Sequence, residues 1–255
     1  MLFISKIVSD RVALVTDTMA DCTKELTIEE IRKSQKQVIG YSNKRLRAYS
    51  DADAVVRELN LRSKLSGGLA SLFEYYVESY YGALIMHLPM GSAEKLNGRE
   101  VDLVIPSYVD YYKASGFDAI PIKHLILENG VLGFQGDWTL RGSLIEELVL
   151  PDSFVSFSDN CFAMCDSLRR VHLSSNVEDI EGGCFCQCRN LELVTASEGT
   201  ALLNIFSYAF SGCKKLKEVQ GFSEATYVRS DAFTGCLSLS AEFKAVLKRA
   251  EEYYS

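Results

Sequence analysis

The stretch that decides the fold is GGCFCQCRNL, residues 182–191, in which three cysteines stand at alternate positions. Taken alone, this spacing fits a metal-binding site, a redox site or a disulfide-bonded segment. The rest of the chain separates these possibilities, because the motif recurs. Four segments read small residue, Phe, two residues, Cys, two residues, Leu: CFAMCDSL from Cys161, CFCQCRNL from Cys184, AFSGCKKL from Ala209 and AFTGCLSL from Ala232.

An apolar–x–apolar pair belongs to each unit and continues upstream, where the cysteine is absent. It occurs at Leu103/Ile105, Leu125/Leu127, Leu148/Leu150, Val171/Leu173, Val194/Ala196 and Val219/Gly221, in steps of 22, 23, 23, 23 and 25 residues. Such a pair indicates a short strand, because alternate side chains of a strand share a face. A unit of this length cannot bury its apolar face alone, so the repeats predict a solenoid of stacked units.

The segment LRRVHLSSNVEDIEGGCFCQCRNLELV, residues 168–194, resembles the BspA-like class of leucine-rich repeats. Units of that class read roughly LxxIxIPxxVxxIxxxAFxxCxxLxxI, and the resemblance covers about residues 101–240. Three departures stand out. The first two units lack the Phe–Cys pair, Thr139 stands where Phe is expected, and the 25-residue step implies an insertion near ASEGTAL, residues 196–202.

This register explains seven of the eight cysteines as packing residues. Cys188 is the core cysteine of its repeat, between Cys165 and Cys213, while Cys184 fills a slot that holds small residues elsewhere. A zinc site normally needs ligand pairs that converge tetrahedrally, whereas a buried free cysteine behaves as a small hydrophobe. We therefore expect reduced cysteines and no bound metal, with a transient disulfide or an adventitious metal as the alternatives.

The chain is expected to have an α+β fold with three parts. A small N-terminal α+β domain occupies residues 1–96, the solenoid with six short parallel strands in 22–25-residue repeats occupies 101–240, and a capping helix occupies 241–255. Ser240 and the apolar stripe that follows it predict the capping helix. The polar, glycine-containing segment 89–100 is interpreted as the linker.

Within the N-terminal part, two alternating segments around Ser9-Asp10 predict a hairpin, and Thr27 with Glu30 predicts a helix from Ile28. A second helix is expected over residues 53–65. Apolar residues at helical spacing predict a tyrosine-rich helix over 69–84. That helix is expected to pack in the core and cap the first repeat, or to serve as a surface for self-association.

Composition and charge limit the function classes. No apolar run reaches the eighteen residues of a membrane-spanning helix, and the first residues lack the features of a secretory signal, so we expect a cytoplasmic protein without a membrane partner. Residues 1–100 hold 14 Lys and Arg against 13 Asp and Glu, while residues 101–255 hold 13 against 21. Because the acidic repeats repel phosphates, direct nucleic-acid binding there is not expected.

No sequence motif assigns a catalytic residue, a metal ligand or a cofactor. Phosphate-binding loops, GxGxxG and GxSxG are absent. The first hypothesis is a non-enzymatic module that binds a protein through the repeat sheet or the N-terminal domain. The alternatives are an intracellular inhibitor or decoy of a host enzyme or nucleic-acid machine, from a bacterium or a phage, and an enzyme with its site in the N-terminal domain.

Strand alternation places one row of side chains on the outer face of the predicted sheet, opposite the core pairs. In chain order the row is Val104, Ile126, Val149, His172, Thr195 and Gln220, apolar in its first half and polar in its second. Glu147, Arg170 and Glu218 would border it with charge. Two interpretations are open: the N-terminal domain covers the apolar half, or that half is an exposed patch for a partner.

Overall fold

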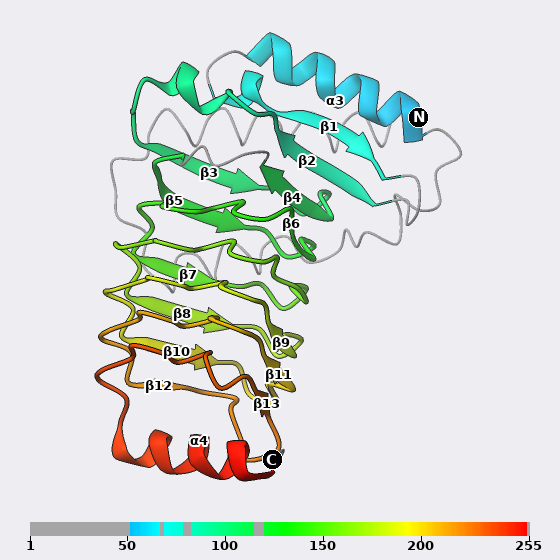
Figure 1. Ribbon diagram of the computed structural model, residues 1–255. Helices are drawn as coiled ribbons and strands as arrows, with labels where there is room; N and C mark the ends of the chain where they lie inside the picture. The colour runs from blue at the N-terminus through cyan, green and yellow to red at the C-terminus, as the bar shows by residue number, and fades with distance from the viewer. Residues whose placement is uncertain (1–51, 67–68, 79–82, 115–119, 254–255) are drawn as a thin grey trace.

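The computed structural model describes residues 52–66, 69–78, 83–114 and 120–253, and its main feature is a stack of short parallel strands between two helices (Figure 1). The first face of the stack is built from β3 (Val101–Ile105), β5 (Ile122–Leu127), β7 (Glu147–Val149), β8 (Arg170–Leu173), β10 (Leu193–Ala196) and β12 (Glu218–Val219). β3 pairs with β5, and β7, β8, β10 and β12 pair in that order, all parallel. The six predicted strands are confirmed.

The register of these strands follows the repeat. Leu148 lies opposite Val171, Val171 opposite Val194, and Val194 opposite Val219. Each of these side chains is buried. The apolar–x–apolar pairs therefore form one continuous row inside the solenoid, as the period required.

A second ladder of strands forms the other face, and the sequence did not predict it. Its strands are β1 (Glu74–Val77), β2 (Leu84–Leu88), β4 (Tyr111–Ala114), β6 (Gly133–Gln135), β9 (Asp179–Ile180), β11 (Asn204–Ile205) and β13 (Tyr227–Val228). They form two sheets, in the orders β1-β2-β4-β6 and β13-β11-β9. A single bridge between Gly133 and Ser156 continues the first sheet toward the second.

The predicted helix over residues 69–84 is wrong. This stretch holds a short 3-10 helix, η2 (Ala70–Leu72), then β1 and the start of β2, which pair antiparallel; residues 79–82 lie outside the described part. Buried Phe73 and Tyr75 alternate with exposed Glu74, which is a strand pattern, and adjacent Tyr and Val residues favour strands. The predicted self-association through a tyrosine-rich helix therefore lacks its helix, because this segment forms η2, β1 and the start of β2.

Two other predicted helices are confirmed. α3 (Ala52–Ser66) covers the helix expected over 53–65, and α4 (Ala241–Tyr253) follows the last repeat (Figure 1). Ser240 caps α4, since its Oγ accepts a hydrogen bond from the Phe243 N–H at 3.0 Å. The hairpin at Ser9-Asp10 and the helix from Ile28 lie outside the described residues.

One sheet crosses the segment that was predicted to be a linker. β2 pairs in parallel with β4, and a 3-10 helix, η3 (Ala93–Leu96), lies between them in the chain. The division of the chain into separate domains stays a prediction.

A spine of phenylalanine rings runs through the centre of the solenoid. Phe162, Phe185, Phe210 and Phe233 stack in turn, with ring centroids 5.6, 5.5 and 5.3 Å apart and interplanar angles of 8°, 10° and 12°. Phe243 of α4 meets the last ring edge-on at 5.5 Å. The capping helix thus closes the spine with the contact geometry that aromatic pairs prefer.

The cysteines follow the same spine and answer the question that their spacing raised. The thiols of Cys188, Cys213 and Cys236 donate to the main-chain oxygens of Phe162, Phe185 and Phe210, at 3.1, 3.0 and 3.1 Å. Each cysteine therefore binds the phenylalanine of the preceding repeat. The described cysteines are free thiols, and Cys22 lies outside the described residues.

Candidate protein-binding face

The predicted row on the outer face of the sheet is aligned in the structure. Val104 lies opposite Ile126, Val149 opposite His172, and His172 opposite Thr195. Gln220 follows β12 directly and joins the row through its side chain, because its Oε1 accepts a hydrogen bond from the Ala196 N–H at 3.2 Å. Strand pairing therefore brings together residues that are 22 to 25 positions apart in the chain.

The apolar half of the row is largely closed to solvent. Val104 is 8% exposed and packs against Ala70 of η2, and the partly buried Ile126 packs against both. Val149 is 3% exposed. Residues before the repeats therefore contribute to covering the first strand of this face. The assignment of these three positions to partner binding stays a prediction.

The polar half of the row remains partly open and is internally organised. The His172 ring lies between two hydroxyl groups, with Nδ1 2.8 Å from Thr195 Oγ1 and Nε2 3.2 Å from Ser197 Oγ. Thr195 also donates its hydroxyl hydrogen to the Val171 main-chain oxygen at 3.3 Å. Both ring nitrogens of His172 therefore have a hydroxyl group within hydrogen-bond distance. These contacts fix the orientation of the ring.

Charged residues lie beside the row in the structure. Arg170 and Glu147 form an ion pair with 3.0 Å between Nη1 and Oε1, and the Arg170 side chain is 61% exposed. Glu218 occupies the same register on β12, separated from Arg170 by Leu193. A pair at this exposure stabilises the fold by about 0–1 kcal/mol, so its main effect is on the pattern of charge at the surface.

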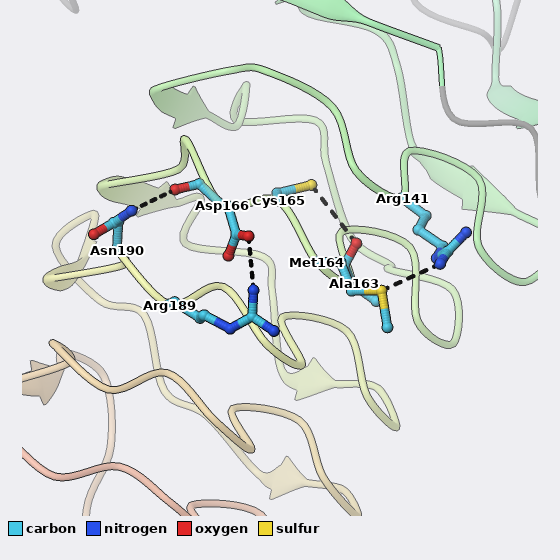
Figure 2. A network of polar contacts seen from close by, with 7 residues as sticks. All are labelled: Arg141, Ala163, Met164, Cys165, Asp166, Arg189 and Asn190. Carbon is cyan, nitrogen blue, oxygen red and sulfur yellow. Dashed lines mark hydrogen bonds and ion pairs between the residues drawn. The ribbon is translucent and has the colours of Figure 1, made fainter.

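A second polar network, on the turns beyond the phenylalanine spine, was missed by the sequence interpretation (Figure 2). Arg189 and Asp166 form an ion pair, with 2.9 Å between Nη1 and Oδ2. Asn190 Nδ2 donates a hydrogen bond to the Asp166 main-chain oxygen at 2.8 Å. One repeat earlier, an Arg141 N–H donates to the Met164 sulfur at 3.2 Å. The signal that could have found the ion pair is periodic: opposite charges stand 23 residues apart, one repeat, at 166 and 189.

Other ionisable groups have structural explanations. The Asp102 carboxylate lies 2.7 Å from His124 Nδ1 on the neighbouring strand. Burial, and then the charge of Lys113, lower the pKa of His87, although Glu74 opposes the shift. Burial also raises the pKa values of the Cys188 and Cys213 thiols well above the ordinary range. Such thiols are poor nucleophiles and poor metal ligands, since both roles need the thiolate.

Within the described ranges, no group of three or more His, Cys, Asp and Glu side chains is arranged to hold a metal ion. Among the same residues, none of the helices has the length and apolar character required to span a bilayer.

Comparisons with known proteins agree with the repeat register. A family model described as "BspA type Leucine rich repeat region (6 copies)" matches residues 101–216 and 134–253. A search of curated proteins found no match.

A search of solved structures found similar leucine-rich repeat proteins. The crystal structure of a T. pallidum leucine-rich repeat protein has a TM-score of 0.51 at 20% identity, covering 72% of this chain and 95% of that one. A leucine-rich repeat protein from Bacteroides ovatus has a TM-score of 0.43 at 18% identity, over 61% and 53% of the two chains. A leucine-rich cell surface protein from Faecalibacterium prausnitzii has 0.41 at 19%, over 68% and 40%.

Proposed function

Because the chain belongs to the family of BspA-type leucine-rich repeat proteins, we propose that it binds a protein partner through the outer face of its parallel sheet. Leucine-rich repeat proteins generally mediate interactions between proteins. The observation that carries the proposal is the polar half of the row. His172, Thr195 and Gln220 stand side by side on consecutive strands, partly or fully exposed, with charge beside them.

The geometry of this half suits protein recognition. The strands form a continuous parallel ladder, so the side chains on it are held at fixed spacing before a partner arrives. The two hydroxyl contacts of His172 order its ring as well. A pre-ordered surface loses less conformational entropy on binding than a mobile one, which favours affinity. We propose that the partner places polar groups opposite this row and contacts Arg170 and Glu218 at its border.

In this proposal the apolar half of the row stabilises the fold and does not contact the partner. Val149 is too buried to contact a partner without rearrangement, and an aspartate there would test folding instead of binding. The experiment should therefore change positions that reach solvent, such as the partly buried His172 and the exposed Gln220.

The test is affinity capture from native lysate with wild-type protein and two folded variants. The double variant His172→Glu, Gln220→Lys changes the row, whereas Lys214→Glu changes an exposed residue on the turns. We expect the captured protein to bind the double variant about tenfold more weakly, the effect of losing roughly 1.4 kcal/mol at the centre of an interface. Lys214→Glu should bind like wild type. Equal capture by all three would remove the sheet face from consideration.

The narrower expectations stay proposals with their own tests. A cytoplasmic location would be checked by fractionation with an antibody against the native chain. A role as inhibitor or decoy would require that the captured protein lose activity when this protein is added in equimolar amount. Enzymatic activity in the N-terminal part is the third alternative.

A further inference from the structure

One repeat is longer than its neighbours, and strand pairing locates its extra residues. Ala196, the last residue of β10, pairs with Leu173, 23 positions earlier, whereas Asn204 of β11 pairs with Asp179, 25 positions earlier. The two extra residues therefore lie within 197–203. Insertions in repeat proteins form loops on one face of the stack, which is often the binding face.

The insertion forms a tight turn from Ser197 to Thr200. The Thr200 N–H donates to the Ser197 main-chain oxygen at 3.1 Å, and Gly199 has a φ of +85° at the position where a type II turn requires a positive φ. The Thr200 hydroxyl group also lies 3.2 Å from the Ser174 main-chain oxygen of the preceding repeat. The turn is therefore held against the stack, while Glu198 and Gly199 at its tip are exposed.

The turn begins beside the polar half of the row. Along the chain after β10, Ser197 shares the outer face with Thr195, because alternate residues of an extended strand point to the same side. The Ser197 N–H donates to the Leu173 main-chain oxygen at 3.0 Å, and its hydroxyl group lies 3.2 Å from His172 Nε2. The extra residues thus stand at the edge of the surface that the proposed function uses.

Carboxylates lie at both ends of the strands that carry this half. Glu218 lies opposite Leu193, the first residue of β10, and Glu198 follows the last residue of β10 by two positions. Among the described residues, neither Glu198 nor Glu218 has an ion-pair partner, whereas Glu147 on the same face pairs with Arg170. From the first repeat to the C-terminus the chain has 13 Lys and Arg against 21 Asp and Glu. Such a surface attracts a basic partner and repels an acidic one.

We propose that the turn from Ser197 to Thr200 is the part of the binding surface that selects the partner, and that the partner places a basic segment against it. This inference rests on the proposed function and adds the chemistry of the partner. Lys or Arg side chains of the partner reach Glu198 on the turn and Glu218 on β12. The 25-residue unit breaks the regular spacing of the stack, which gives the partner a feature that distinguishes one repeat from the next.

The first experiment is photo-crosslinking in native lysate from three exposed positions. A photoreactive amino acid replaces Ala201 directly after the turn, Gln220 on the sheet face, or Glu251 on α4. We expect one protein to be crosslinked from 201 and 220 and not from 251. Its peptide crosslinked from 201 should contain more Lys and Arg than Asp and Glu.

The outcomes separate this inference from the proposed function. Crosslinking from 220 but not from 201 would overturn the role of the turn and leave the proposed function standing. A peptide at 201 without net positive charge would overturn the basic segment alone. No crosslink from 220 would overturn the proposed function, and this inference with it.

The second experiment measures association rates of the purified crosslinked protein with wild type, Glu198→Gln and Glu251→Gln by surface plasmon resonance. Both variants lose one exposed carboxylate, so the comparison isolates its position. Glu198→Gln should slow association at least about threefold at low salt, because charges at the rim of an interface steer the encounter. The difference should disappear at high salt, which screens exposed charges. Glu251→Gln should associate like wild type, and an unchanged rate for Glu198→Gln would overturn the role of the turn carboxylate.

Discussion

At the scale of the residue, the fold rests on a division of labour inside each repeat. The phenylalanine of each repeat buries a large apolar surface. The cysteine three residues later is small, and its thiol donates a hydrogen bond to the main-chain oxygen of the phenylalanine one repeat earlier. Each of these oxygens also accepts a main-chain N–H, as Phe162 O does from the Cys165 N–H at 3.3 Å, so the thiol adds a second, weak hydrogen bond that alanine would not make. Of the three alternate cysteines, Cys184 and Cys188 are thus parts of this packing, whereas Cys186 is only partly buried.

Phe185→Ala is expected to destabilise the protein by about 3–5 kcal/mol, because it removes a fully buried ring and leaves a cavity. The ring stacks on two neighbours, Phe162 and Phe210, so the gap interrupts the spine in its middle. Chemical denaturation with circular dichroism measures the change, with the exposed Lys214→Ala as control. An unchanged midpoint would show that the stacked rings contribute nothing to stability.

Tyr112→Phe is expected to act in the opposite direction and stabilise the protein by about 1 kcal/mol. The Tyr112 side chain is fully buried, and its hydroxyl group has no hydrogen-bond partner among the described residues. Removing a buried, unsatisfied polar group relieves its desolvation cost without changing the packed shape. Thermal unfolding should give a higher melting temperature, and a lower one would mean that the hydroxyl group has a stabilising contact.

At the scale of the element, the sequence predicted the strands that carry the repeated apolar pair. The six strands of the first face carry the apolar–x–apolar pair, and each is confirmed at its position. Three strands of the second face, β9, β11 and β13, are only two residues long, which is too short to show an alternation. Tyr75 and Tyr76 could satisfy a helical or a strand period, and tertiary pairing with β2 decided for the strand.

The candidate face could be predicted only in part, for the same reason. Alternation along each strand identified the row from Val104 to Gln220, and strand pairing aligns Val104 with Ile126 in one sheet and Val149 with His172 and Thr195 in another. Burial of Val104 depends on Ala70, which belongs to a segment outside the repeat. No periodic signal connects those two positions, so the covering of the apolar half required the structure.

Ser240→Ala is expected to lower stability by about 1 kcal/mol, since it removes the N-cap of α4 and leaves the Phe243 N–H without that acceptor. Helix α4 covers the last repeat through buried Phe243 and Ala250. Ser240→Asp serves as control because aspartate also caps, and it should retain most of the stability. Equal losses in both variants, measured by urea denaturation, would contradict a capping role.

At the scale of the whole molecule, the repeats stack their short strands one above another. Helix α3 lies at one end of the stack and helix α4 at the other (Figure 1). Ion pairs between adjacent turns, such as Glu147 with Arg170 and Asp166 with Arg189, neutralise much of the local charge. Among the described residues of the row, the polar half is more accessible than the largely buried apolar half. The central claim is that this half binds a protein.

The most direct test of that claim is site-specific photo-crosslinking in native lysate. A photoreactive amino acid at Gln220, exposed on the sheet face, is compared with the same group at Lys214, exposed on the turns. We predict that one protein, identified by mass spectrometry, is crosslinked from position 220 and not from position 214. Crosslinking of that protein from 214 but not from 220 would contradict the account and place the binding surface on the turns.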